Sequence, residues 1–196
     1  MKRVLSLVLA MLMLMLMLIL MVFTSCAPVV VTPGIWEVEA AYQKAMEAYF
    51  WFYVTTISTE DFDSSDSSTY MDADGMIYSK VKHDTIKTYA DLENYLHMLF
   101  ADDIVAELLD DEGDFQRYRD FNDALYAVLA DRGTDISKGE ETLEVNQESS
   151  LKFICTVHVE LLDEKDYVMV TGYETHEYAY ELIDGRWVFT NFYLFR

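Results

Sequence analysis

The chain has 196 residues, of which 52% are hydrophobic and 14% aromatic, and its formal net charge at pH 7 is −21. This length accommodates one ordinary domain beside a targeting segment, and the apolar content excludes a globally disordered chain. A strongly negative surface repels nucleic acids and anionic lipid headgroups, so we expect no nucleic-acid partner and favour basic partners or cations. The simplest alternative is that the acidity only keeps the protein soluble.

The N-terminus is organised like a secretory signal. Met1-Lys2-Arg3 is basic, residues 4–23 are apolar with one serine, and Thr24-Ser25-Cys26 follows. A basic start, an apolar segment and small residues before a cleavage point are typical of exported proteins. The ending resembles the lipobox of bacterial lipoproteins, although Phe23 departs from the usual leucine. The resemblance implies cleavage before Cys26 and lipidation of this cysteine with diacylglycerol, whose acyl chains include palmitate.

The predicted organisation has three parts: a lipoprotein signal peptide over residues 1–25, a lipidated linker over 26–34 and one domain over 35–196. The alternative is an uncleaved membrane helix, because about 20 apolar residues can span a bilayer. In both cases the domain lies on the extracytoplasmic face of the cell membrane and is tethered to it.

Three segments have the pattern of helices. Between Trp36 and Thr55 apolar residues recur at spacings of three and four, and the aromatic run Tyr49 to Tyr53 predicts burial on more than one side. Thr88 to Asp91 resembles a capping box before an apolar stripe. Asp102 is expected to cap a second short helix, which ends at residues 110–113.

Alternation of apolar and polar residues predicts a sheet at the C-terminus. The alternating runs are Leu151 to Leu162, Tyr167 to Leu182 and Arg186 to Phe195, with Thr142 to Asn146 leading into them. Asp184-Gly185 predicts a type I′ hairpin turn, Met76 to Val81 a short strand, and Asn122-Asp123 a further hairpin. One face of such a sheet must be covered. We therefore predict an α+β fold, with the long N-terminal helix and two short helices packed on a curved antiparallel sheet.

The sequence contains no recognisable catalytic motif. A Gly-x-Ser-x-Gly elbow, a phosphate-binding Gly-rich loop, His-Glu-x-x-His and Cys-x-x-Cys are all absent. Cys155 is in phase with the apolar residues of its strand and is expected to be a core residue. We therefore expect no catalytic residue, no cofactor and no enzymatic activity. A site assembled from distant strands, in which a histidine meets a carboxylate or Cys155, is the alternative.

One acidic loop contains a stretch that resembles part of a calcium-binding loop. Asp72 to Gly75 resembles the centre of an EF-hand loop, but Tyr70 and Val81 would then occupy the first and twelfth ligand positions, which excludes it. A looser cation site through Asp61, Asp63 and Asp66 is an alternative to a solvated loop, and no metal site is predicted. Arg132 is a cation among acids, which a turn or an ion pair explains.

An ordered set of segments resembles the IseA family, inhibitors of cell-wall DL-endopeptidases in Gram-positive bacteria. The set comprises Ala48 to Tyr53, Asp74 to Tyr78, Tyr89 to Leu96, Leu125-Tyr126 before Ala130 to Gly133, and Asp184 to Phe192. No single motif is specific, and the resemblance covers most of residues 36–195. It implies an extracytoplasmic protein that binds NlpC/P60-type cysteine peptidases and restrains autolysis of the cell wall. The family members best known from bacilli are secreted free, whereas this chain carries a lipobox-like sequence.

The resemblance places no inhibitory residue on a position of this chain. The candidate binding residues are therefore charged side chains in predicted loops: Asp61, Asp63, Asp66, Asp72, Asp74, Asp131 and Arg132. More distantly, the order of elements resembles NTF2-like and cystatin-like folds, which host many functions. This gives the main alternative, a non-catalytic pocket lined by Tyr49, Trp51, Tyr53 and Trp187 that holds a small ligand or a wall fragment.

Replacing the predicted lipidation site tests the membrane anchor. Cys26→Ala is expected to release the protein from membranes or to leave the precursor unprocessed, because alanine cannot accept the lipid. Mass spectrometry and membrane fractionation of wild type and variant measure both effects. An unchanged mass and an unchanged distribution would contradict the lipoprotein prediction.

Overall fold

The computed structural model describes residues 31–60, 68–110 and 116–195. The chain divides into two compact units, Met1–Val31 and Thr32–Arg196, and every described helix and strand belongs to the second. The predicted signal peptide and Cys26 lie outside the described residues, as do Asp61, Asp63 and Asp66. In the described part of the chain, no helix is long and apolar enough to cross a membrane.

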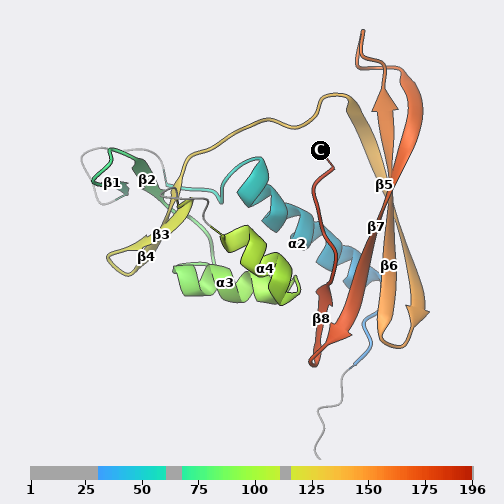
Figure 1. Ribbon diagram of the computed structural model, residues 1–196, viewed down its shortest axis with the longest axis horizontal. Coiled ribbons are helices and arrows are strands. Elements are labelled where there is room, and N and C mark those ends of the chain that lie inside the picture. Colours follow the sequence, from blue (N-terminus) through green and yellow to red (C-terminus); the bar gives the residue numbers. More distant parts are fainter. Residues whose placement is uncertain (1–30, 61–67, 111–115, 196) are drawn as a thin grey trace, which may run out of the picture. The chain divides into compact units, whose positions relative to one another are not determined.

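The fold is α+β, as predicted. The helices of the described residues are α2 (Ile35–Tyr53), α3 (Tyr89–His97) and α4 (Asp102–Leu109). The strands are β1 (Thr69–Met71), β2 (Ile77–Lys80), β3 (Tyr118–Phe121), β4 (Ala124–Val128), β5 (Lys138–Ser149), β6 (Lys152–Leu162), β7 (Val170–Ile183) and β8 (Arg186–Phe189). They form two antiparallel sheets in the orders β1-β2-β4-β3 and β5-β6-β7-β8, and the helices lie between the sheets (Figure 1).

The β5–β8 sheet is the predicted C-terminal sheet. Asp184 and Gly185 have φ values of 49° and 82°, so the β7–β8 connection has the left-handed backbone that a type I′ turn requires. β5 begins four residues before the predicted Thr142. The third alternating run is shorter than predicted, because β8 ends at Phe189. The following segment leaves the sheet and buries Phe192 and Phe195 in the core.

The expectation of one curved sheet is incorrect, because β1 to β4 form a sheet of their own. The predicted hairpin around Asn122-Asp123 is confirmed as the β3–β4 turn, with φ values of 50° and 60°. β2 then pairs with β4, and β1 with β2. Residues 129–137 follow β4 outside any strand before β5 begins. The first sheet therefore ends at Val128, and none of β1 to β4 pairs with any of β5 to β8.

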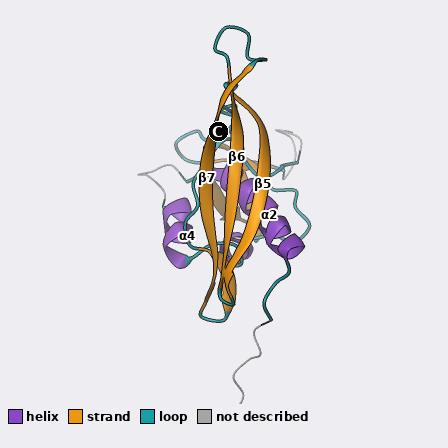
Figure 2. Cartoon of the chain, turned by 90° about the vertical axis from the view of Figure 1, so that its right-hand side faces the viewer, coloured by secondary structure: helices purple, strands orange, loops and turns teal. Residues whose placement is uncertain are grey.

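The core lies between α2 and the inner face of the β5–β8 sheet (Figure 2). On β6 the inward residues Phe153, Cys155, Val157 and Val159 are fully buried and alternate with partly exposed ones. α2, the helix expected between Trp36 and Thr55, buries a stripe at helical spacing: Val38, Tyr42, Ala45, Met46, Ala48, Tyr49 and Trp51. The inward residues of β6, at every second position, and those of α2, at helical spacing, belong to one apolar cluster.

The short helices begin differently from one another. The predicted capping box of α3 is confirmed, because the Asp91 amide donates to Thr88 Oγ1 (3.2 Å) and the Thr88 amide donates to the Asp91 carboxylate (2.9 Å). The prediction that Asp102 caps α4 is wrong, because Ala101 occupies that position. The Asp102 carboxylate instead accepts from Arg186 at 3.1 Å and lies 3.0 Å from His97 Nδ1, which ties the helices to the β7–β8 turn.

Tyr118 fastens the end of α2 to β3. Its buried hydroxyl donates to the Trp51 carbonyl (2.8 Å) and accepts from the Ile57 amide (3.1 Å). The Trp51 carbonyl belongs to the last turn of α2, where carbonyls have no partner inside the helix. The hydroxyl therefore satisfies a helix-terminal acceptor and a loop donor at once.

Tyr118→Phe is expected to lower the free energy of unfolding by about 1–3 kcal/mol, because both buried backbone groups lose their partner. Urea unfolding followed by circular dichroism measures the loss. Tyr173→Phe is the matched control, since Tyr173 is exposed on β7 and should change stability by less than about 0.5 kcal/mol. Equal effects of the two substitutions would contradict the structural role of the Tyr118 hydroxyl.

Candidate functional site

The predicted binding residues that the structure describes lie in two loops. In the β1–β2 turn the Asp72 carboxylate accepts from the amides of Asp74 (3.1 Å) and Met76 (2.8 Å) and pairs with Arg119 at 3.5 Å. Asp72 therefore holds the turn, and Asp74 is exposed beside it. In the loop after β4, Asp131 accepts from the Gly133 amide. The hydrogen bond of Asp131 stays within its own loop, and those of Asp72 stay within the β1–β2 turn, which the ion pair to Arg119 joins to β3.

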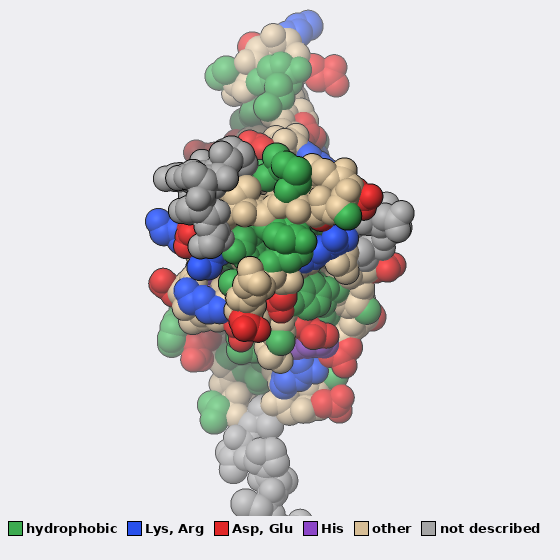
Figure 3. Space-filling model, turned by 90° about the vertical axis from the view of Figure 1, so that its left-hand side faces the viewer, with side chains coloured by type: hydrophobic (Ala, Val, Ile, Leu, Met, Phe, Trp, Pro, Cys, Tyr) green, Lys and Arg blue, Asp and Glu red, His purple; other side chains and the backbone are tan. Residues whose placement is uncertain are grey.

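Arg132 is placed differently from the acids, because its side chain lines a cavity of about 420 Å³. The other walls come from the end of α2 (Phe52 and Tyr53), the end of α4 (Glu107 to Asp110), Tyr89, and Arg117 with Tyr118 at the start of β3. On the β1–β4 side of the molecule hydrophobic side chains gather near the centre of the surface, with Lys and Arg side chains beside them (Figure 3). The cavity was not predicted, because its walls come from five separate parts of the chain.

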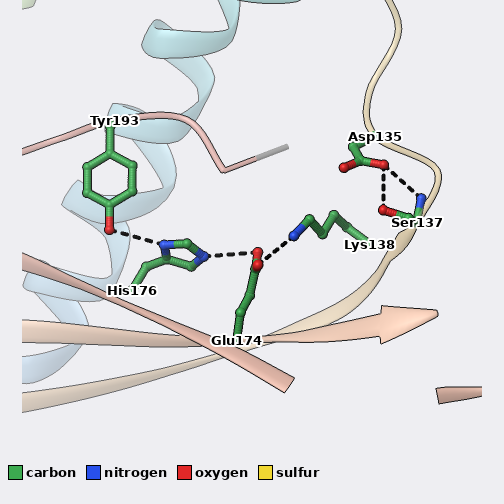
Figure 4. A network of polar contacts seen from close by, with 6 residues as sticks. All are labelled: Asp135, Ser137, Lys138, Glu174, His176 and Tyr193. Atoms are coloured by element: carbon green, nitrogen blue, oxygen red, sulfur yellow. Dashed lines mark hydrogen bonds and ion pairs between the residues drawn. The ribbon is translucent and has the colours of Figure 1, made fainter. Parts of the chain in front are cut away.

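A polar network crosses the inner face of the β5–β8 sheet beyond the aromatic core (Figure 4). Tyr193 Oη lies 3.0 Å from His176 Nδ1, His176 Nε2 lies 3.0 Å from Glu174, and Glu174 pairs with Lys138. Burial opposes ionisation of Glu174, but its bonds to Lys138 and His176 prevail and lower its pKa. The i, i+2 spacing of Glu174 and His176 on one strand is the signal that could have indicated this pair.

Val157 pairs with His176 across the β6–β7 ladder, and Cys155 pairs with Tyr178. Because residues two apart on a strand point to the same face, Cys155 and His176 lie on the same face of the sheet. The expected core position of Cys155 is confirmed, since its side chain is fully buried. Burial, with a smaller contribution from Glu39, raises the pKa of the thiol to about 12. Both ring nitrogens of His176 are within hydrogen-bond distance of other groups. The network therefore offers Cys155 no free base, and a nucleophilic thiolate is disfavoured.

The four aromatic residues of the alternative ligand pocket have different surroundings. Trp51 is buried against His83 and Tyr95. Tyr49 is buried and stacks on Tyr53, with ring centroids 4.9 Å apart. Trp187 instead packs on Phe153 and Tyr180, which belong to the β5–β8 sheet. These side chains contribute to packing at separate places rather than forming one pocket.

The loop between β6 and β7 extends beyond the rest of the described chain at one end of the sheet (Figures 1 and 2). It presents consecutive exposed apolar side chains, of which Val168 is 77% and Met169 58% exposed. The Asp166 carboxylate accepts from the amides of these two residues at 3.0 and 3.3 Å. The Asp163 amide donates to the Met169 carbonyl, and the Asp163 carboxylate accepts from the Lys165 amide. The loop is thus exposed and internally braced.

No family model matches the chain, and no curated protein matches it. The resemblance to the IseA family therefore stays a hypothesis. Within residues 31–60, 68–110 and 116–195, no group of three or more His, Cys, Asp or Glu side chains is arranged to hold a metal ion.

Alkylation of Cys155 tests whether its thiol is reactive. A rise in pKa from 9.0 to about 12 reduces the thiolate fraction at pH 8 roughly a thousandfold. Iodoacetamide should therefore label Cys155 far more slowly in the native chain than in urea, and the rate of native labelling should keep rising with pH up to about 12 instead of levelling off near 9. Peptide mass spectrometry measures the rates. Thr156→Cys, on the outer face of β6, is the control that should label readily; fast native labelling of Cys155 itself would contradict its burial.

Proposed function

We propose that this protein is a lipid-anchored, extracytoplasmic lipoprotein that binds and inhibits NlpC/P60-type DL-endopeptidases and so restrains autolysis of a Gram-positive cell wall. The observation that carries the proposal is the β6–β7 loop, with its exposed Tyr167, Val168 and Met169. A cluster of exposed apolar side chains on the returning side of a projecting loop is suited to contact with the cleft of another protein.

The internal hydrogen bonds of the loop support this role. Tyr167 adopts φ 54°, and its amide donates to the Asp163 carbonyl at 2.8 Å, while Asp166 holds the next two amides. A loop that is already ordered loses less conformational entropy on binding than a flexible one. When these apolar side chains are buried against a partner, most of the free energy gained by removing them from water therefore contributes to affinity.

The packing beneath the sheet also favours a protein partner over a ligand enclosed in the core. Tyr42, Tyr178 and Phe192 fill the space between α2 and β7, with ring centroids 4.6–6.1 Å apart. Binding through the main sheet would therefore use its ends and outer surface. The acids of the loop, Asp163, Glu164 and Asp166, would attract a basic catalytic domain and accelerate its association at low salt.

The proposal is tested by inhibition of a purified NlpC/P60 endopeptidase from the same organism, with the full chain in detergent micelles. Wild type should inhibit stoichiometrically and more strongly at low salt. Val168→Asp should weaken inhibition at least about tenfold, because it places a charge among the exposed apolar side chains of the loop. Leu151→Asp is the matched control, since Leu151 is exposed in the β5–β6 turn at the other end of the sheet, and it should inhibit like wild type.

Two results would refute the proposal. One is the absence of inhibition at low salt by wild-type protein whose circular dichroism shows that it is folded. The other is equal inhibition by the Val168→Asp and Leu151→Asp variants, which would place any contact with the peptidase outside the loop.

A further inference from the structure

We propose that the cavity beside the end of α2 binds a small molecule with a free carboxylate, the size of an amino acid or a dipeptide, and that Arg117 and Arg132 hold the carboxylate. The cavity belongs to other elements than the β6–β7 loop. This inference therefore does not depend on the proposed inhibition of a peptidase.

The first reason is an unsatisfied donor. Arg117 Nη1 is buried, and within residues 31–60, 68–110 and 116–195 no hydrogen-bond partner lies within reach of it. A buried charged donor without an acceptor destabilises a fold, so a natural protein normally supplies a partner for it. Because Arg117 also lines the cavity, an acceptor carried by a bound ligand would satisfy this nitrogen.

The second reason is the convergence of two cations in an acidic chain. Asp and Glu number 35 against 14 Lys and Arg, yet Arg117 and Arg132 line the same cavity, and no described carboxylate forms an ion pair with either. Burial and, to a smaller extent, the charge of Arg132 lower the pKa of Arg117. An anion between the two guanidinium groups would remove this repulsion, and a planar carboxylate matches the fork of N–H donors that arginine presents.

The remaining walls indicate the rest of the ligand. Phe52, Tyr53, Tyr89 and Tyr118 provide aromatic surface, which suits an apolar or aromatic body. Glu107 and Asp110 are the other charged residues of the lining. They disfavour a ligand with several negative charges, such as phosphate, and favour one that also has an ammonium group. A volume of about 420 Å³ is at the lower end of the range for small-molecule sites.

A larger hollow, of about 650 Å³, lies beside α2 and is lined by Glu47 and Glu141 without any Lys or Arg. Among its described lining residues, none has a buried donor that lacks a partner. The Arg117 cavity is therefore distinguished from this hollow by its two cations and its unsatisfied nitrogen, and not by its volume.

Calorimetric titration of the full chain in detergent micelles tests the site with three probes. Phenylalanine carries a carboxylate and an ammonium group, phenylalaninamide lacks the carboxylate, and inorganic phosphate is a general anion. Phenylalanine should bind at least tenfold more tightly than either of the others. No binding of phenylalanine, or equal binding of the amide or of phosphate, would overturn the proposal.

Substitutions locate the binding. Arg117→Met should weaken phenylalanine binding at least tenfold while the ligand-free protein melts no lower than wild type, because the substitution removes an unsatisfied buried donor. Arg119→Met is the matched control, since Arg119 lies on β3 but pairs with Asp72 outside the lining, and it should bind within twofold of wild type. Arg132→Met, at an exposed position, should also weaken binding and provides a variant that does not depend on the core. Unchanged binding by the Arg117 and Arg132 variants would overturn the assignment.

Discussion

Aromatic packing between α2 and the inner face of the β5–β8 sheet is the constraint on which the rest of the structure depends. Tyr42 contacts Tyr178, Phe189 and Phe192, which belong to β7, β8 and the segment that follows β8. The apolar face of the sheet has to be covered to be removed from water, and an isolated amphipathic helix is only marginally stable by itself. Each element therefore provides the surface that the other requires. The C-terminal segment leaves the sheet because Phe192 and Phe195 complete this cover.

The β5–β8 sheet extends further than the helix and aromatic side chains that cover its inner face. This difference in length explains where polar groups and an exposed loop occur. Near Cys155 the inner face is apolar and buried, but further along β7 the inward positions are occupied by His176 and Glu174. There Lys138 and Tyr193 replace apolar contacts with hydrogen bonds and an ion pair (Figure 4). Beyond this network the β6–β7 loop has no cover. The sheet thus holds the exposed apolar side chains of this loop away from the core, in a position where a partner could contact them.

The two proposed binding regions use opposite chemistry. The β6–β7 loop joins apolar side chains to acids, which suits a basic protein surface. The Arg117 cavity concentrates two of the few cations of the chain between aromatic walls, which suits a small anion. The loop forms within one hairpin. The cavity lies where the Tyr118 hydroxyl fastens β3 to the end of α2, which brings Phe52 and Tyr53 beside Arg117.

Local patterns in the sequence indicated most of the secondary structure. Asp184-Gly185 and Asn122-Asp123 marked their turns because they tolerate positive φ, and Thr88 with Asp91 marked the start of α3 because the two side chains satisfy amides at a fixed spacing. Cys155 was recognised as a core residue from its phase in an alternating strand. The prediction that Asp102 caps α4 was wrong because the Asp102 carboxylate bonds to Arg186. That partner is 84 residues away, and no local pattern reveals it.

The sequence by itself thus determined the α+β class, the hairpins and the inward residues of β6, since these follow from periodicity and turn chemistry over a few residues. Only the tertiary structure decided that the strands divide into two sheets, that Phe192 closes the core, and that Glu174 and His176 join Lys138. It also decided that Arg117 and Arg132 line one cavity with Tyr53 and Glu107. The physical reason is that such contacts join residues far apart in the chain. Their partners are selected by the packing of whole elements, which no short stretch of sequence encodes.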